Sequence, residues 1–381
     1  MKLERRGIAW ISLIAWATGV VILSTPGRAS AQLSLPGPLI TGLPAARIGH
    51  DIAYDPAQNI LLAVGTSAGI RGRFLDSGGG LVGAEFDIAA SPPFPVARAV
   101  YSPDINDGAG GTGGFLVVWF SVFTKTIHAQ VVAYPLGLIG PRQTVTTVGN
   151  VTGGFYSVQL GLAYSPVSRE FLLAWSDSDA VGSATYVRLA LAGTPIAAPV
   201  MLSTEPFIPL NSEFATFHNN VDVVWNSVTG EFGIVHLVPG GSHMELALTR
   251  VTGNGAIAGR VSLAARESSN NLTLWSAIDV NSTVGNYLVA WVPGLTSGIT
   301  VISIDPDGAV MNETTIPASF PWGLDLAFSP LSRTFLLAIY EPGTPGSAIQ
   351  AREISARGVA LSSTWLGVTD GNFMARLATL G

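Results

Sequence analysis

The sequence predicts an all-β fold made of repeated units of about 50 residues. Three observations carry this prediction: one hairpin-like segment recurs along the chain, turn-forming residues are abundant, and few residues are charged. Glycine and proline number 44 and 24, and charged residues make up 12% of the chain. This composition suits many short strands joined by tight turns. It does not suit a helical bundle, which would need more lysine, glutamate and alanine.

The recurring segment reads as the end of one strand, a tight turn and a second strand. Its clearest copy is YSPVSREFLLAW, from Tyr164 to Trp175. The copies begin at Tyr54, Tyr101, Tyr164, Trp225, Val280 and Phe328. Strand repeats of this period indicate a propeller or a solenoid before any other architecture.

Each copy belongs to a unit that can be divided into four strands. The second strand of a unit is apolar on both faces, as in FLLAW, FLVVW and YLVAW. That pattern indicates a sheet covered on both sides, which is how each blade of a propeller lies between its neighbours. The third and fourth strands are joined by turns rich in glycine, which tolerates the positive φ of tight hairpins. The units run over residues 47–94, 95–150, 151–207, 208–269, 270–320 and 321–372.

We therefore predict a six-bladed β-propeller over residues 47–381. The alternative is seven blades with an incomplete closing blade, because Phe373–Leu377 resembles Phe94–Arg98 in sequence. Three units end their second strand with a tryptophan: Trp119, Trp175 and Trp291. We expect each indole to bury about 150–250 Å² against the following blade.

The N-terminus predicts a signal peptide over residues 1–31. Lys2, Arg5 and Arg6 precede an apolar run from Gly7 to Leu23, and Ala29–Ala31 is an A-x-A cleavage signal. We expect cleavage after Ala31 and a secreted or extracytoplasmic location, in the periplasm or at the cell surface. The alternative is a retained anchor, since the run is about 17 residues and a membrane span needs about 20. We expect no membrane span after cleavage.

The segment 32–46 is rich in proline and predicts an extended stretch that helps to close the ring, with an outer strand around Leu33–Thr41. Removing residues 1–31 takes away four basic residues and one acid, which changes the net charge from −6 to −9. A chain this acidic lacks the basic patch that nucleic acids require. It has no cysteine, so it has neither disulfides nor thiolate chemistry. We also expect the protein to be a monomer.

One set of candidate site residues lies three positions before the first residue of the repeated segment. In a propeller the first strand of each blade lines the central channel, so these positions should lie at one height near one channel mouth. Oxygen ligands of this kind suit Ca²⁺. Asp51, Asp222 and Asp325 are therefore candidate metal ligands, and calcium is the candidate cofactor. The alternative is a hydrated channel in which Arg98 pairs with one of the acids. The full set is Asp51, Arg98, Gly161, Asp222, Ala277 and Asp325.

A second set comes from the loops that lead into these strands, which carry aromatic and histidine residues. Aromatic rings beside polar groups are what sugar and peptide ligands use for stacking and hydrogen bonding. The alternative is a hydrophobic plug between blades, which is the better interpretation for Phe94 and Phe217. The set is His50, Phe94, Tyr156, Phe217, His218, Trp275 and Trp322.

Two motifs are interpreted as turns. Gly65–Gly69 matches G-x-S-x-G, but a nucleophile elbow needs a helix after the turn, and another strand, beginning at Ile70, follows here. Asp305–Gly308 resembles a calcium loop, although the other units place ordinary turns at the same point.

Six four-stranded units of this length resemble the secreted bacterial β-propeller repeat proteins. The placement of the acids is similar to that in six-bladed gluconolactonase-like hydrolases, a resemblance that implies a metal-dependent site; the sequence motifs of that family are absent. The sequence does not decide whether the chain is an enzyme and favours a non-enzymatic binding module for a glycan, peptide or protein partner. The alternative is a calcium-dependent hydrolase or lactonase, and a third interpretation is a structural surface protein. The predicted ligand-binding residues are Asp51, Arg98, Asp222, Asp325, His50, His218, Trp275 and Trp322.

Overall fold

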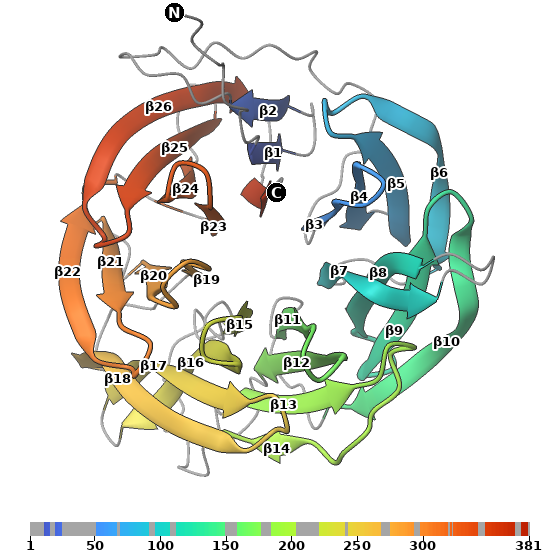
Figure 1. Ribbon diagram of the computed structural model, residues 1–381, viewed down its shortest axis with the longest axis horizontal. Coiled ribbons are helices and arrows are strands. Elements are labelled where there is room, and N and C mark those ends of the chain that lie inside the picture. The colour runs from blue at the N-terminus through green and yellow to red at the C-terminus, as the bar shows by residue number, and fades with distance from the viewer. Residues whose placement is uncertain are drawn as a thin grey trace, which may run out of the picture.

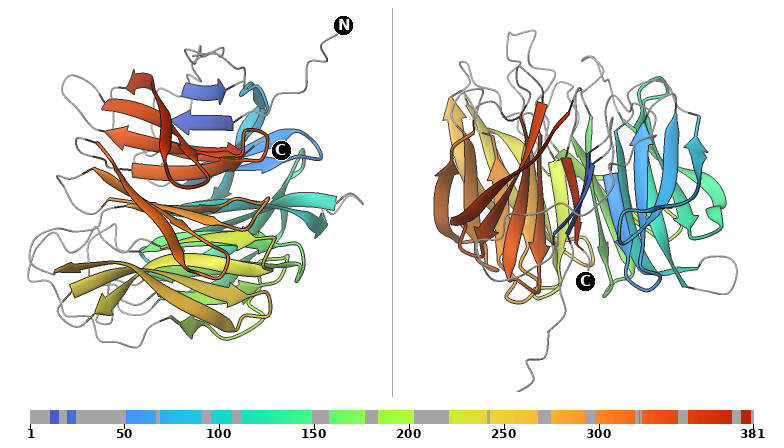
Figure 2. Two further views of the ribbon diagram at one scale, coloured as in Figure 1. Left: turned by 60° about the vertical axis from the view of Figure 1, so that its left-hand side comes forward. Right: turned by 90° about the horizontal axis from the view of Figure 1, so that it is seen from above.

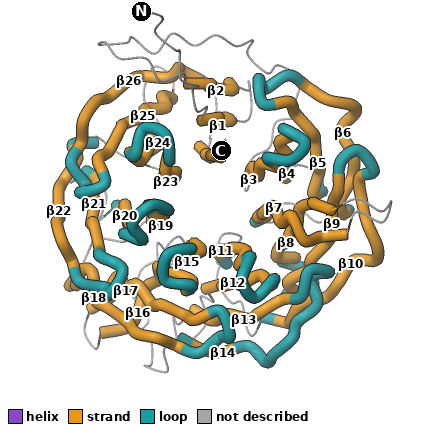
Figure 3. Tube along the Cα trace, in the orientation of Figure 1, coloured by secondary structure: helices purple, strands orange, loops and turns teal. Residues whose placement is uncertain are grey.

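The computed structural model is a ring of seven antiparallel sheets around a central axis (Figure 1). Six sheets have four strands and one has three. The described part of the chain contains strands and turns and no helix (Figure 3), so no described helix is long and apolar enough to cross a membrane. The predicted all-β propeller with six four-stranded units is confirmed. The structure describes residues 11–15, 20–24, 51–66, 69–90, 96–106, 112–148, 158–176, 184–202, 221–240, 243–267, 275–292, 298–318, 321, 323–341, 347–369 and 375–379.

The first three blades follow one another along the chain, and each runs from an inner to an outer strand. Blade 1 is β3 (Asp51–Asp55), β4 (Ile60–Thr66), β5 (Ile70–Asp76) and β6 (Leu81–Ala89). Blade 2 is β7 (Ala97–Asn106), β8 (Thr112–Ser121), β9 (Thr126–Ala133) and β10 (Gly137–Thr147). Blade 3 is β11 (Gln159–Ser165), β12 (Glu170–Ser176), β13 (Ala184–Leu189) and the short β14 (Val200–Met201).

The next three blades repeat the same order, so the first strand of every blade lies nearest the axis (Figure 1). Blade 4 is β15 (Val221–Asn226), β16 (Glu231–Gly240), β17 (His243–Thr252) and β18 (Ile257–Glu267). Blade 5 is β19 (Ser276–Val280), β20 (Tyr287–Trp291), β21 (Ile299–Ile304) and β22 (Val310–Ile316). Blade 6 is β23 (Gly323–Ser329), β24 (Thr334–Glu341), β25 (Ser347–Ser355) and β26 (Ala360–Thr369).

The seventh sheet joins the two ends of the chain. Its inner strand is β27 (Ala375–Thr379), which pairs with β1 (Ile11–Ala15), and β1 pairs with β2 (Val20–Ser24). β27 lies between β23 of blade 6 and β3 of blade 1. This incomplete blade is the alternative that the sequence had left open. β1 and β2 fall inside the segment whose removal the sequence predicts. Cleavage stays a prediction, and it would remove both of the other strands of this sheet. The predicted closure segment, 32–46, lies outside the described residues.

The recurring segment folds as a capped hairpin turn between the first and second strands. The residue that begins the turn accepts hydrogen bonds from backbone N–H groups two or three positions later, as Asn226 Oδ1 does from Val228 N at 3.1 Å and Thr229 N at 3.3 Å. Side chains of this kind hold the turn by replacing a backbone acceptor. Four positions after the cap, the chain takes a left-handed conformation at Asn59, Arg169, Gly230, Gly285 and Arg333. The caps are Asp55, Ser102, Ser165, Asn226, Asn281 and Ser329.

The hydrophobic core lies between neighbouring blades. Five clusters of buried side chains each combine residues of two adjacent blades, from blades 1 and 2 to blades 5 and 6. Trp119, Trp175 and Trp291 all pack with the preceding blade, so the expectation that they face the following blade is wrong. Alternation explains the difference: along β12, Trp175 faces blade 2 while its neighbour Ala174 faces blade 4.

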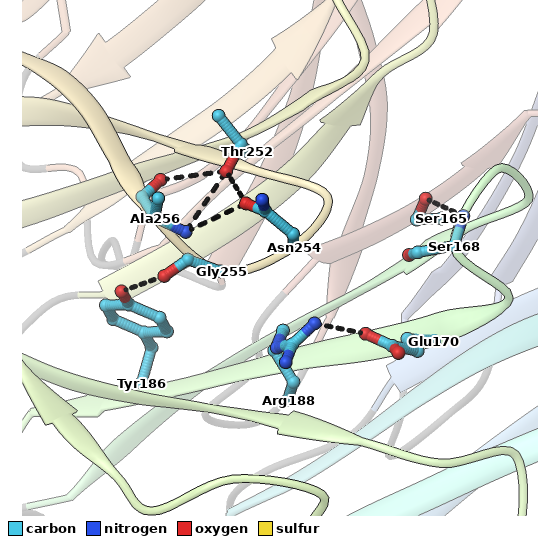
Figure 4. A network of polar contacts seen from close by, with 9 residues as sticks. All are labelled: Ser165, Ser168, Glu170, Tyr186, Arg188, Thr252, Asn254, Gly255 and Ala256. Atoms are coloured by element: carbon cyan, nitrogen blue, oxygen red, sulfur yellow. Dashed lines mark hydrogen bonds and ion pairs between the residues drawn. The ribbon is translucent and has the colours of Figure 1, made fainter.

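Polar contacts also join adjacent blades at the turns between third and fourth strands. In Figure 4, Tyr186 of blade 3 donates a 2.8 Å hydrogen bond to the carbonyl oxygen of Gly255 in the blade 4 turn. Arg188 beside it pairs with Glu170 of its own blade at 3.0 Å. Arg250 of blade 4 makes the equivalent contact with the carbonyl oxygen of Pro306 in blade 5, at 2.8 Å. Each of these turns is thus held by the blade before it.

Both motifs interpreted as turns are confirmed. At the G-x-S-x-G match, β4 pairs with β5, with Gly65 opposite Arg71 and Thr66 opposite Ile70, so a strand stands where a nucleophile elbow needs a helix. Ser67 and Ala68 lie outside the described residues. Asp305 caps an ordinary hairpin turn by accepting a 2.7 Å hydrogen bond from Ala309 N.

Candidate functional site

The predicted ring of acids occupies equivalent positions on the inner strands. Asp51 pairs with Val64, Asp222 with Val235 and Asp325 with Ala338, so each acid lies opposite the same position of the second strand. The inner strands surround the axis of the ring (Figure 1) and run side by side through the molecule (Figure 2, right). Acids far apart in the sequence therefore lie around one axis.

Two of these acids link adjacent blades through the backbone. Asp51 Oδ2 accepts a 2.8 Å hydrogen bond from Ala99 N of blade 2, and Asp222 Oδ2 accepts a 3.3 Å hydrogen bond from Ile278 N of blade 5. An inner strand has a partner strand on one side only, so amide groups on its other edge need another acceptor. We call this contact, in which a carboxylate binds the next inner strand, a carboxylate bracket.

The sequence did not single out a third bracket, at Asp279. Asp279 Oδ2 accepts a 2.6 Å hydrogen bond from Phe328 N of blade 6, and Oδ1 accepts a 2.7 Å hydrogen bond from Val280 N. The acid lies two residues after Ala277, which holds the position compared across the units. The sequence does show an acid on this short strand, but only one position per strand was compared across the units, so Asp279 was missed.

The electrostatics of Asp279 differ from those of an ordinary aspartate. Burial, and then the negative charges of Asp222 and Asp325, raise its pKa from 3.8 to about 7, although the two backbone hydrogen bonds act in the opposite direction. The residue keeps a partly exposed surface, while the surrounding blades exclude much of the bulk solvent from its carboxylate. We call Asp222, Asp279 and Asp325, on three consecutive inner strands, the acid arc.

The remaining positions of the ring serve other purposes. Arg98 is 8% exposed and donates a 3.3 Å hydrogen bond from Nη1 to the carbonyl oxygen of Ala97. At Gly161, a Cβ atom would lie 2.9 Å from the backbone of both Asp222 and Val223. Blade 4 thus approaches blade 3 too closely for any side chain at this position.

The structure does not place the predicted metal ligands close enough together to share one metal ion. Among the described residues, no three histidine, cysteine, aspartate or glutamate side chains lie close enough together to hold a metal. Calcium binding through Asp51, Asp222 and Asp325 stays a prediction without geometric support in this part of the chain.

The predicted aromatic face is only partly within the described residues. Trp275 is half-buried and packs on the core between blades 5 and 6, and its carbonyl oxygen accepts a 2.9 Å hydrogen bond from Val292 N. For this residue the hydrophobic alternative agrees with the structure. His50, His218 and Trp322 lie outside the described residues, as do Phe94, Tyr156 and Phe217.

Comparison with known proteins finds similarity at the level of the fold. No family model and no curated sequence matches the chain. A putative 6-phosphogluconolactonase of Bacteroides fragilis aligns with a TM-score of 0.60 at 11% identity, over 99% of each chain. The periplasmic gluconolactonase of Pseudomonas aeruginosa aligns with a TM-score of 0.59 at 15% identity, over 96% of this chain and 99% of that one. A Lactobacillus plantarum protein aligns equally well, with a TM-score of 0.59 at 15% identity.

These comparisons contradict the prediction of a non-enzymatic binding module for a glycan, peptide or protein. The gluconolactonase and the putative 6-phosphogluconolactonase align with this chain over 96–99% of its length. Identities of 11–15% establish the fold alone. The chain is a β-propeller, and its fold is similar to those of these three proteins.

Proposed function

We propose that this protein is an exported lactonase that opens an uncharged sugar-acid lactone at the acid arc. The observation that carries the proposal is the acid arc itself, three carboxylates on consecutive inner strands, one of which has its pKa raised to about 7. The end-to-end likeness to proteins described as a gluconolactonase and a putative 6-phosphogluconolactonase supports the same reaction class, lactone hydrolysis.

Lactone hydrolysis needs a group that first accepts and then returns a proton. Water adds to the carbonyl carbon, the ring C–O bond breaks, and the released alkoxide must be protonated. A carboxyl group suits both steps best when its pKa lies near the working pH. Hydrogen bonds from the backbone hold Asp222 and Asp279 in fixed orientations, and fixed orientation is what a catalytic group requires.

The charge of the site indicates which lactone it accepts. Asp222, Asp279 and Asp325 place negative charge on three neighbouring inner strands, and like charge across a binding site costs several kcal/mol. A phosphorylated lactone would be repelled, whereas the hydroxyl groups of an uncharged sugar lactone can donate hydrogen bonds to the carboxylates. We therefore favour an aldonolactone without phosphate.

Export is part of the proposal. The basic end, the apolar run and Ala29–Ala31 support a cleaved signal peptide, and one full-length structural neighbour is described as periplasmic. The mass of the protein recovered from the expressing cells tests this directly. A mature chain beginning at Gln32 supports export with cleavage, whereas a chain that still contains β1 and β2 contradicts it.

The function is tested with the purified protein in a pH-stat, using D-glucono-1,5-lactone and its 6-phosphate. We expect hydrolysis above the spontaneous rate for the uncharged lactone and a lower kcat/KM for the phosphorylated one. D222N and D325N should reduce kcat/KM markedly, while D305N, in a hairpin turn that is separate from the acid arc, should not. Parallel assays with EDTA and with added calcium test the metal prediction. A rate equal to that of the buffer for both lactones would refute the proposal.

A further inference from the structure

One face of the ring carries exposed apolar side chains at the tips of its inner turns. In a four-stranded antiparallel blade, the turn between the first and second strands lies at the same end as the turn between the third and fourth. We call this end of the ring the turn face, and its inner turns surround the axis in Figure 3. In four consecutive blades a valine or leucine stands two or three positions after the turn cap and is 48–77% exposed. These residues, the turn-tip patch, are Val167, Val228, Val284 and Leu331.

The repeated position of these side chains distinguishes them from ordinary surface residues. Single exposed apolar residues need no explanation, and the tips of tight turns are normally glycine, asparagine, aspartate or serine. Here four successive blades place a valine or leucine at the tip instead. Equivalent turns of a ring lie at one height along its axis, so the four tips lie near one plane. The turns between third and fourth strands add further exposed apolar side chains at the same end, at Leu136, Ile257 and Val359.

The charge around the turn-tip patch indicates what it binds. Arg333, in the inner turn of blade 6, is exposed. Arg169 holds the equivalent position in blade 3, and its side chain is 62% exposed although it pairs with Asp104 at 3.2 Å. The acids of these four turns, Glu170 and Glu231, are mostly buried and pair with arginines of their own blades. The patch is therefore basic on a chain whose net charge is −6.

We propose that the turn face docks on the surface of a phospholipid bilayer. Apolar tips in one plane can enter the boundary between headgroups and acyl chains, and such binding strengthens with buried apolar area and with attraction to anionic lipids. Arg169 and Arg333 then lie at the level of the lipid phosphates, which guanidinium groups bind well. A second copy of the chain fits less well, because a face-to-face pair would bring two basic patches together without an exposed acid from these turns between them.

Binding to vesicles tests the proposal. The purified full-length protein is mixed with vesicles of phosphatidylcholine, or of phosphatidylcholine with phosphatidylglycerol, and the bound fraction is measured by flotation. We expect binding to both kinds, with several-fold stronger binding to the anionic one. V167S/L331S should lower the partition coefficient at least about tenfold on both kinds, because two apolar tips are lost. V228S/V284S should act in the same way, whereas R333Q should mainly reduce the preference for anionic vesicles.

F123S is the matched control. Phe123 is 73% exposed in the turn between the second and third strands of blade 2, at the opposite end of the ring. Its replacement removes a large exposed apolar side chain without changing the turn face, so F123S should bind like the wild type. Every variant keeps the same N-terminal apolar run, so a difference in binding comes from the substitution itself. Thermal unfolding should be unchanged in all of them, because the replaced side chains are exposed.

The other outcomes overturn the proposal. Absence of binding to both kinds of vesicle would do so, as would binding that V167S/L331S and V228S/V284S leave unchanged or that F123S reduces equally. Sedimentation velocity without vesicles tests the alternative occupant: a wild-type dimer that V167S/L331S converts to a monomer would assign the patch to a second copy of the chain. The lactonase function does not depend on these results, because the acid arc lies on the inner strands and not at these turns.

Discussion

The buried histidine of blade 4 makes the stability of the protein depend on pH in a direction that can be derived. His236 is fully buried, at the position of the second strand where other blades carry tryptophan. Its Nδ1 lies 3.2 Å from the carbonyl oxygen of Leu237 and its Nε2 lies 2.8 Å from Thr249 Oγ1. A carbonyl can only accept, so Nδ1 carries the proton and the hydroxyl of Thr249 donates to Nε2. Burial favours this neutral form of the ring in the folded protein.

Protonation of His236 should weaken the folded state. Burial lowers its pKa from 6.5 to about 4, so between these values the unfolded chain binds the proton and the folded chain does not. The contribution is fully present above pH 6.5 and is lost as the pH falls to about 4. At about 1.4 kcal/mol for each pH unit, the loss in the free energy of unfolding is about 3 kcal/mol.

The H236Q variant isolates this effect from other titrating groups. Urea unfolding followed by tryptophan fluorescence gives the free energy of unfolding of wild type and variant at each pH. The variant loses stability at neutral pH through altered packing, and that cost does not depend on pH. We expect the difference between the two proteins to shift by about 3 kcal/mol in favour of H236Q from pH 7.5 to pH 4. A shift below about 1 kcal/mol would show that His236 titrates normally. Such a result would contradict the complete burial of its side chain.

Three further predictions concern the contacts between blades, each measured as the free energy of unfolding. Trp175→Ala should cost about 3–5 kcal/mol, because the indole is 5% exposed within the core between blades 2 and 3; a cost below about 1 kcal/mol would contradict that packing. Gly161→Val should be far more destabilising than a surface substitution, because the backbone of Val223 leaves no room for a Cβ; normal stability would mean that blades 3 and 4 lie further apart. Asn226→Ala should cost about 1–3 kcal/mol, since its Nδ2 donates a 2.7 Å hydrogen bond to Gly285 O of blade 5 while Oδ1 caps its own turn; a neutral result would remove this link between blades.

The fold could be predicted because the sequence repeats its own local rules. The segment that begins at Tyr164 places a cap, a turn and an apolar second strand in fixed order, and five other segments do the same. Every blade must bury the same faces against its neighbours, so one interpretation applies to all of them. The two motifs that resemble functional sites, at Gly65 and Asp305, could be assigned to turns because the surrounding strands left no other structure for them.

The site could be predicted only in part, because its properties depend on contacts between blades. The register of Asp51, Asp222 and Asp325 follows from the repeat, but their hydrogen bonds to the next inner strand do not. Asp279 was missed because its pKa is raised first by burial and then by two acids that are distant in sequence, and neither effect shows in the repeat. The direction in which Trp175 packs was also wrong, because the repeat shows that a face is buried and not which neighbour buries it.

Ring closure depends on both chain ends. The sequence around Phe373 indicated an extra inner strand, and the structure places β27 in that role. Its partner β1, and β2, which pairs with β1, come from a segment that the sequence assigns to export. A strand pattern and a signal peptide both require apolar residues, so composition alone does not distinguish them.

The most direct test of the proposed chemistry is the pH dependence of kcat/KM for the hydrolysis of D-glucono-1,5-lactone by the wild-type protein. This ratio reports the ionisation of essential groups in the free enzyme. Because the proton acceptor must be ionised, we predict that kcat/KM rises with pH through a midpoint near 7. A profile that is flat from pH 5 to pH 8, or a rate no faster than that of the buffer, would contradict it.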